Sequence, residues 1–168
     1  MKKLLLTFAA ALLVSFFASA QKKYSVYAVG FYNQENLFDT CHDEGKKDYD
    51  FLPNGSYHWD GLKYSHKLHN MARALADMGT DVLPNVGCAM IGLSEVENAK
   101  VLTDLVNQPA LKARNMQFVH IEGPDKRGID CAMLYNPALF KLESDTLYQY
   151  VQELEKDSAF KTRGFLTI

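Results

Sequence analysis

The fold is decided by residues 89–98, Ala89-Met90-Ile91-Gly92-Leu93-Ser94-Glu95-Val96-Glu97-Asn98. A short apolar run ends abruptly here in carboxylates and an amide, which is typical of a buried strand that delivers oxygen atoms to the edge of a sheet. A second stretch repeats the pattern, because the run Tyr24–Tyr32 leads directly into Asn33-Gln34-Glu35-Asn36. Hard cations such as Mg²⁺ are held by such sparse oxygen ligands and by water. The pair of clusters therefore predicts a metal-assisted enzyme.

Each cluster also has a simpler explanation. An isolated Glu95 is an ordinary exposed residue at a strand end, or an acid favoured by the dipole of the helix that follows. Asn33 readily ends a strand through turn chemistry. The metal hypothesis depends on the two strands being neighbours, since both clusters then share one edge of the sheet.

The first twenty residues have the pattern of a cleavable signal peptide. Lys2 and Lys3 precede an apolar stretch from Leu4 to Phe17, and Ala18-Ser19-Ala20 supplies the small residues of a cleavage site. A membrane anchor is the alternative, but the stretch is short for a transmembrane helix. We expect a mature chain over residues 21–168, secreted or periplasmic, with no transmembrane span after cleavage.

Composition limits the remaining possibilities. Residues 21–168 have the size of one domain. The full chain carries a net charge of −2, and removing the two lysines of the leader makes it more acidic, so it has no basic footprint for coating nucleic acid. Cys41, Cys88 and Cys131 fit neither a zinc spacing nor a disulfide framework. One disulfide with a leftover thiol is allowed in an oxidising compartment, but the sequence does not select the pair.

The order of the predicted elements indicates an α/β sandwich with helices packed on a mixed sheet. An amphipathic helix over 62–78 follows a long loop over 39–59, and a second helix begins after the N-cap Asn98. Long loops inside compact domains are usually functional or disordered. The predicted strands cover residues 24–32, 88–94, 116–121 and 129–135, with short candidates at 139–143, 146–154 and 165–168.

A third polar motif, Arg127-Gly128-Ile129-Asp130, opens one of these strands. An Asp that opens an apolar strand beside an Arg and a Gly is expected to orient a catalytic group or to contact a phosphate oxygen, which makes Asp130 and Arg127 candidate catalytic residues. The alternative is a turn with a local ion pair that contributes little at the surface. His66 and His69 lie three residues apart on the predicted helix and are interpreted as a solvated face.

Taken together, three stretches resemble the N-terminal half of the endonuclease/exonuclease/phosphatase family, and in particular its secreted members in Bacteroidetes-type bacteria. The resemblance runs from about Tyr24 to the end of the chain, and its specificity lies in the order and spacing of the motifs. The stretches are Phe31-Tyr32-Asn33-Gln34-Glu35-Asn36-Leu37-Phe38-Asp39, Ile91-Gly92-Leu93-Ser94-Glu95-Val96-Glu97-Asn98 and Arg127-Gly128-Ile129-Asp130-Cys131-Ala132-Met133-Leu134-Tyr135.

The resemblance implies a four-layered α/β sandwich and a phosphoesterase that uses Mg²⁺ (or Mn²⁺). By resemblance, Glu95 matches the metal-binding glutamate, Asn33 supports the metal site, and Glu35 occupies the place of an acidic residue near the metal. Asp130 and Arg127 match a motif expected to serve catalysis. The implied substrate is a phosphate ester, such as a nucleic acid, a phospholipid head group or an inositol phosphate.

The chain also departs from the family pattern. The catalytic histidine motif, the Gly-Asp-x-Asn motif and the final Ser-Asp-His motif of the second half do not occur in it. We therefore expect residues 21–168 to be an inactive fragment, truncated at the C-terminus, of an active parent enzyme. The alternative is a non-catalytic or degenerate binding module that keeps the fold.

Overall fold

A mixed four-stranded sheet forms the centre of the molecule in the computed structural model, which describes residues 24–149 and 163–168. The strand order is β1-β2-β4-β3; β1 and β2 are parallel, and β4 runs antiparallel to both β2 and β3. A separate antiparallel pair joins β5 to β6. The bounds are β1 Ala28–Leu37, β2 Cys88–Val96, β3 Gln117–His120, β4 Asp130–Tyr135, β5 Thr146–Tyr148 and β6 Phe165–Thr167.

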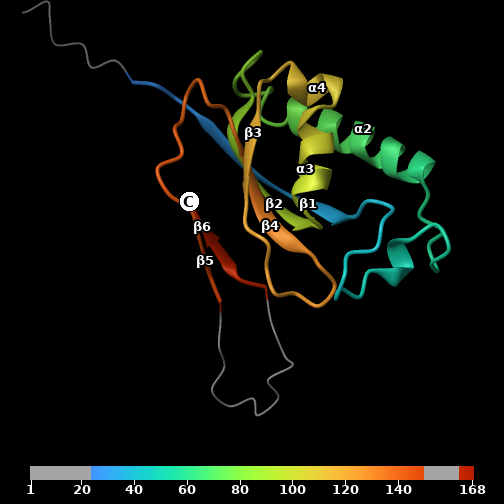
Figure 1. Cartoon of the computed structure of the whole chain (residues 1–168). Helices are drawn as coiled ribbons and strands as arrows, with labels where there is room; N and C mark the ends of the chain where they lie inside the picture. The colour runs from blue at the N-terminus through green and yellow to red at the C-terminus, as the bar shows by residue number, and fades with distance from the viewer. Residues whose placement is uncertain (1–23, 150–162) are drawn as a thin grey trace, which may run out of the picture.

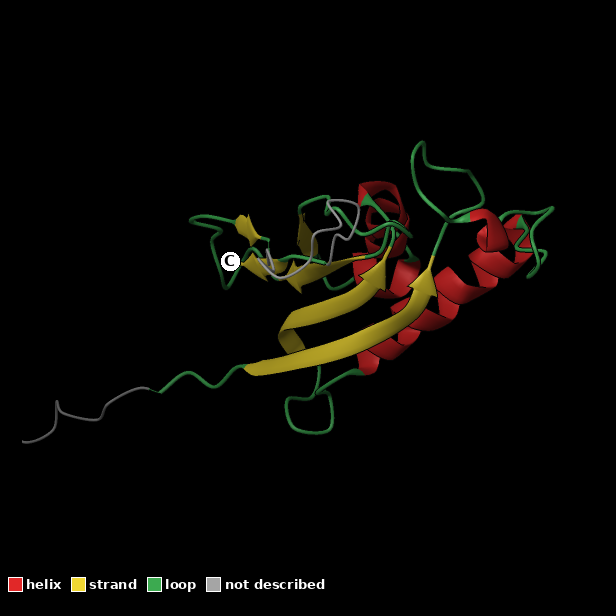
Figure 2. Ribbon diagram, turned by 90° about the horizontal axis from the view of Figure 1, so that it is seen from below, coloured by secondary structure: helices red, strands yellow, loops and turns green. Residues whose placement is uncertain are grey.

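Three helices cover one side of this sheet, and the β5–β6 pair lies on the other side (Figures 1 and 2). The bounds are α2 Gly61–Asp77, α3 Ala99–Val106 and α4 Pro109–Lys112, with a 3₁₀ turn η1 at Tyr49–Phe51. Asp60 caps α2 by accepting a hydrogen bond from the backbone N–H of Lys63 at 2.9 Å. The chain is therefore a mixed α/β protein, as the sequence predicts.

The hydrophobic core lies between the sheet and the helices. Leu93 and Leu134 on the sheet and Leu102 and Leu105 on α3 are fully buried. Burial of each such side chain contributes about 1.5–3 kcal/mol. The opposite face is less well covered, since Val29 and Phe31 on β1 are each 65% exposed.

Most predicted elements are confirmed, with differences at their ends. The predicted strand over 24–32 begins only at Ala28 and continues through the polar cluster to Leu37. The predicted strand over 139–143 is wrong, because the backbone N–H groups of Leu139 and Phe140 both bond to the carbonyl of Asn136 and form a turn. The prediction over 146–154 is confirmed for Thr146–Tyr148, and its end lies outside the described residues.

The leader and the three cysteines are the sequence features that bear on the cellular compartment. The predicted signal peptide over 1–20 lies outside the described residues, and no helix in the described ranges is both long and apolar enough to cross a bilayer. Cys88 is buried, Cys131 half-buried and Cys41 exposed, and all three are free thiols in the described part of the chain.

Candidate functional site

The two polar clusters meet at one edge of the sheet, inside a pair of irregularities in β1 and β2. Asn33 pairs with Ser94 and Leu37 pairs with Val96, so three residues of β1 lie opposite the single residue Glu95. The ladder between β2 and β4 is also interrupted at Glu95. Such bulges re-aim side chains and are common beside active sites.

The backbone in these bulges adopts a conformation that non-glycine residues rarely use. The φ angles are +51° at Glu35, +61° at Asn36 and +61° at Glu95. A left-handed residue of this kind costs about 1–3 kcal/mol and is often found where function requires a particular side-chain direction. The irregular backbone therefore separates Glu95 from both neighbouring ladders and presents its carboxylate at the sheet edge.

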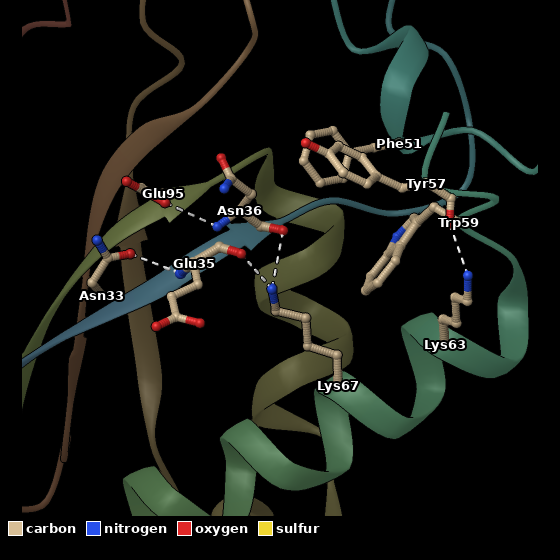
Figure 3. A pocket seen from close by; sticks show the side chains of 9 residues that line it. All are labelled: Asn33, Glu35, Asn36, Phe51, Tyr57, Trp59, Lys63, Lys67 and Glu95. Carbon is tan, nitrogen blue, oxygen red and sulfur yellow. Dashed lines mark hydrogen bonds between the residues drawn. The ribbon is translucent and has the colours of Figure 1, made fainter. Parts of the chain in front are cut away.

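One hydrogen bond joins the two clusters, and a second holds the backbone within the first cluster. Oε2 of Glu95 accepts from the backbone N–H of Asn36 at 3.0 Å, and Oδ1 of Asn33 accepts from the backbone N–H of Glu35 at 2.7 Å. Figure 3 shows the carboxylate of Glu35 pointing away from that of Glu95. Asn33 and Glu95 are thus the better-placed oxygen donors, and Glu35 lies beside them.

This donor set fits a hard divalent cation. Mg²⁺ usually keeps several waters and binds through one or two carboxylates together with substrate phosphates. Glu95 is half-buried, and only its Oε2 is engaged by a described residue, so its Oε1 is available. The amide oxygen of Asn33 has a second lone pair beyond its bond to Glu35. Together they supply the few oxygen ligands that such an ion requires.

An open pocket of about 700 Å³ adjoins these residues. Lys67 of α2 reaches into it and donates hydrogen bonds to the backbone carbonyls of Glu35 and Asn36, the latter at 3.2 Å. Burial lowers the pKa of Lys67, and the charges of Glu35 and Glu95 oppose that shift. The ammonium group is therefore held next to the bulge, with a third proton free to meet an anionic group.

Aromatic side chains from the loop before α2 form the other wall of the pocket (Figure 3). Phe51 lies against Tyr57 with ring centroids 5.0 Å apart, and Trp59 donates from Nε1 to the carbonyl of Phe38 at 3.0 Å. The Lys67 ammonium lies 5.6 Å from the centre of the Trp59 ring. The long loop, for which the sequence left function or disorder open, thus builds one side of the pocket.

A second group of acids lies behind the edge and is buried. Glu97 is 1% exposed, and its Oε2 accepts from the backbone N–H of Asp39 at 2.7 Å. Burial raises the pKa of Glu97 to about 8, with further contributions from Asp39, Asp43 and Asp48. At neutral pH the Glu97 side chain is therefore mostly protonated and serves the fold.

The two candidate residues of the third motif, Asp130 and Arg127, lie in different surroundings. Asp130 is 3% exposed and accepts from the backbone N–H of Gly123 at 3.0 Å. Arg127 is instead at the surface, and its Nε lies 3.9 Å from Oδ1 of Asp125. Asp130 pairs with Val96 in the sheet, so it lies at the same edge as Glu95, whereas Arg127 takes no part in the pocket.

Several members of the pocket were not predicted from the sequence, among them Lys67 and Trp59. Lys67 looks like any surface lysine of an amphipathic helix, and only the docking of α2 against the β1 bulge reveals its place. Trp59 belongs to an irregular loop that has no period to read. The available signal was the concentration of aromatic residues in a loop of unusual length.

Comparison with known proteins gives one family. A sequence model described as "Endonuclease/Exonuclease/phosphatase family" matches residues 28–168, which include both polar clusters and the Asp130 motif. No curated protein and no solved structure matches the chain.

Proposed function

The chain belongs to the endonuclease/exonuclease/phosphatase family, and we propose that it carries the metal-binding and phosphate-binding part of an exported phosphoesterase site. Members of the family are hydrolytic enzymes and are generally dependent on a divalent metal. The proposed cation is Mg²⁺ (or Mn²⁺). The proposed substrate is a phosphate ester of a nucleic acid, a phospholipid head group or an inositol phosphate.

The observation that carries this proposal is the left-handed Glu95 in a double bulge. A strand that only had to bury its apolar face would not require a strained glutamate at its end. Here the strain directs a carboxylate into a pocket that also contains Asn33 and Lys67. Anion-binding and cation-binding groups are thus adjacent, as phosphate-ester chemistry demands.

The residues of this chain have separate roles in the proposed reaction. Glu95 and Asn33 hold the cation, which when bound polarises a phosphoryl oxygen as a Lewis acid. Lys67 binds a phosphate oxygen through its free proton, and the bulge carbonyls keep its ammonium group in position. The aromatic wall borders the substrate and limits access of water to that side.

The residues that activate water are proposed to be absent from residues 21–168. The motifs that would supply them do not occur in the sequence. We therefore expect the chain alone to bind metal and phosphate without efficient turnover, which is also the behaviour of a non-catalytic binding module. A protein that extends this chain with the family's later motifs should hydrolyse at least one of plasmid DNA, sphingomyelin and inositol phosphates.

The decisive test measures metal binding by the chain itself. Mn²⁺ titrations followed by electron paramagnetic resonance should show one site that Glu95→Gln weakens on the order of 100-fold. Glu143→Gln, at a well-exposed position, is the matched control and should leave binding unchanged. Equal Mn²⁺ affinity in the wild type and Glu95→Gln would exclude this site.

Export is tested separately. When the chain is expressed with its leader in a bacterial host, the exported protein should have the intact mass of residues 21–168, with Gln21 as its first residue. A protein that retains residues 1–20 would contradict the proposed signal peptide.

A further inference from the structure

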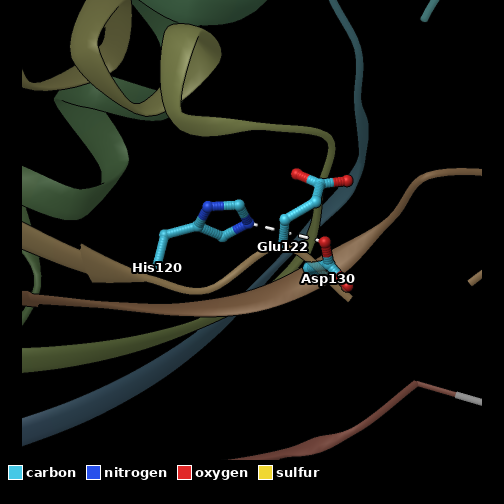
Figure 4. A group of neighbouring side chains, drawn as sticks. All are labelled: His120, Glu122 and Asp130. Atoms are coloured by element: carbon cyan, nitrogen blue, oxygen red, sulfur yellow. Dashed lines mark ion pairs between the residues drawn. The ribbon is translucent and has the colours of Figure 1, made fainter. Parts of the chain in front are cut away.

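A second cluster of metal-ligating side chains lies at the ends of β3 and β4 (Figure 4). It consists of His120, Glu122 and Asp130, whose ligand atoms all lie within 4.8 Å of one another in the described part of the chain. None of these three residues lines the pocket beside Glu95. The cluster therefore offers ligands that are distinct from those of the proposed Mg²⁺ site.

His120 supplies the first indication of a ligand. Its side chain is 4% exposed, and its Nε2 forms no hydrogen bond with any described residue. A buried nitrogen without a partner costs about 1–3 kcal/mol. Figure 4 shows the ring directed toward Asp130, and Nε2 lies 3.5 Å from Oδ2 of that carboxylate.

The separation of these two atoms is informative. It is longer than a good hydrogen bond, which spans about 2.7–3.2 Å. Two ligands of a tetrahedral ion with bonds of about 2.0–2.2 Å are roughly 3.4 Å apart. The 3.5 Å between His120 and Asp130 therefore matches two ligands of one ion better than it matches a direct bond.

The surroundings of Asp130 hold its carboxylate in place. The backbone N–H of Gly123 donates to Oδ2 at 3.0 Å, and a β-carbon at Gly123 would collide with Oδ1. Metal-binding carboxylates are commonly oriented by a hydrogen bond of this kind. Gly123 is thus required by the close approach of its backbone to the acid.

Glu122 completes the set from a more exposed position. Its side chain is 51% exposed, and its Oε1 lies 3.0 Å from Nζ of Lys46. Lys46 also donates to the carbonyls of Gly123 and Asp125, at 3.0 and 3.3 Å, so it has other partners if Glu122 turns inward. Because its carboxylate already lies within 4.8 Å of the other two ligand atoms, a small rotation of this exposed side chain brings it to the spacing of a tetrahedral ligand.

We propose that His120, Glu122 and Asp130 bind a Zn²⁺ ion, with water as the fourth ligand. An imidazole together with two carboxylates suits zinc and related first-row metals, whereas Mg²⁺ prefers oxygen ligands alone. The site joins the end of β3, and the loop that follows it, to the start of β4. It goes beyond the proposed function, because it involves none of the oxygen donors at Glu95.

The test titrates Zn²⁺ against the chain in the Glu95→Gln background, so that the proposed Mg²⁺ site does not contribute. Competition with a chromogenic zinc chelator should show one equivalent bound, and His120→Ala should weaken the affinity on the order of 100-fold. His69→Ala, an exposed histidine on α2, is the matched control and should bind as tightly as the parent. Co²⁺ substitution should give visible absorption that His120→Ala abolishes.

A second variant guards against loss of folding at the buried histidine. Glu122→Gln changes a half-exposed side chain and should weaken Zn²⁺ binding at least tenfold while circular dichroism remains unchanged. The proposal is overturned if the parent binds no zinc at micromolar concentrations, or if Glu122→Gln binds it as tightly as the parent. Failure of the Mn²⁺ titration at Glu95 would leave this result unaffected, so the two sites are tested independently.

Discussion

Glu95 and Glu97 lie two residues apart in one segment and have opposite surroundings. Glu95 sits in a bulge with φ of +61° and faces an open pocket. Glu97 is 1% exposed, and burial raises its pKa to about 8. The comparison shows how a single irregular residue allows one strand end to direct one acid into an open pocket and to bury another.

The largest expected effect concerns Glu97 and pH. Its pKa in the folded chain is about 8, above the ordinary value of 4.5, so the folded state holds an extra proton between these values. The free energy of unfolding should therefore fall as pH rises from about 4.5 to about 8, by about 1.4 kcal/mol per unit of pKa difference. Glu97→Gln removes this slope.

Urea denaturation between pH 5 and pH 9 measures the effect. The wild type and Glu97→Gln should differ progressively in stability as pH rises, with the variant favoured at pH 9. Parallel curves across the range would show that Glu97 is ionised in the folded protein and would remove the contrast with Glu95.

Substitution by glycine at each position tests whether Glu95 and Glu97 differ in what they contribute to metal binding and to stability. Glu95→Gly should weaken Mn²⁺ binding on the order of 100-fold, while the free energy of unfolding changes by less than about 1 kcal/mol. Relief of the left-handed strain offsets the lost hydrogen bond to Asn36. Glu97→Gly should instead cost several times more stability, because it leaves a cavity and an unpaired Asp39 N–H. A Glu95→Gly variant as unstable as Glu97→Gly would mean that Glu95 serves the fold.

A smaller effect is expected at the cationic side of the pocket. Lys67→Ala should weaken inorganic phosphate binding in the presence of Mn²⁺ by about tenfold, since one charge-assisted hydrogen bond contributes about 1.5 kcal/mol. Lys63→Ala is the matched control on the same helix, because Lys63 lines the same pocket but bonds to the carbonyl of Tyr57 at 2.8 Å and not to the bulge. Isothermal titration calorimetry measures the phosphate affinity of the two variants. An equal loss of phosphate affinity in both variants would mean that Lys67 acts through general electrostatic attraction and makes no specific contact with phosphate.

Much of this architecture follows from sequence periodicity. The helix over 62–78 and the strands that contain Leu93 and Leu134 follow from apolar spacing, and Asn98 was predicted as an N-cap. The predicted position of both polar clusters on one edge is also confirmed, because β1 and β2 are parallel neighbours. These features depend on local patterns or on the general geometry of parallel strands.

The rest depends on contacts between distant segments. The bulges at Glu35 and Glu95 arise where two ladders fall out of register, and no local propensity marks a glutamate for a left-handed conformation. The contact of His120 with Asp130 requires the antiparallel register of β3 with β4, in which His120 pairs with Ala132. Alternation along β4 then puts Asp130 on the face that His120 shares. The sequence alone assigns no role to His120, and only the pairing of β3 with β4 brings it to Asp130.

The smallest expected effect lies at the end of the same segment, where Asn98 joins the acids to α3. Its Oδ1 accepts from the backbone N–H of Val101 at 3.1 Å, and its Nδ2 donates to Oδ2 of Asp43 at 3.2 Å. Asn98→Ala should lower the free energy of unfolding by about 1 kcal/mol through loss of the cap.

Asn98→Asp keeps the cap but places a carboxylate against Asp43, so it should cost a similar amount of stability at pH 7 and less at pH 4. Asp60→Ala removes a cap whose side chain has no second partner among the residues that the structure describes, so it is the control and should show the 1 kcal/mol loss alone. If Asn98→Asp is as stable as the wild type at pH 7, the Asp43 contact contributes nothing, and Asn98 serves α3 alone.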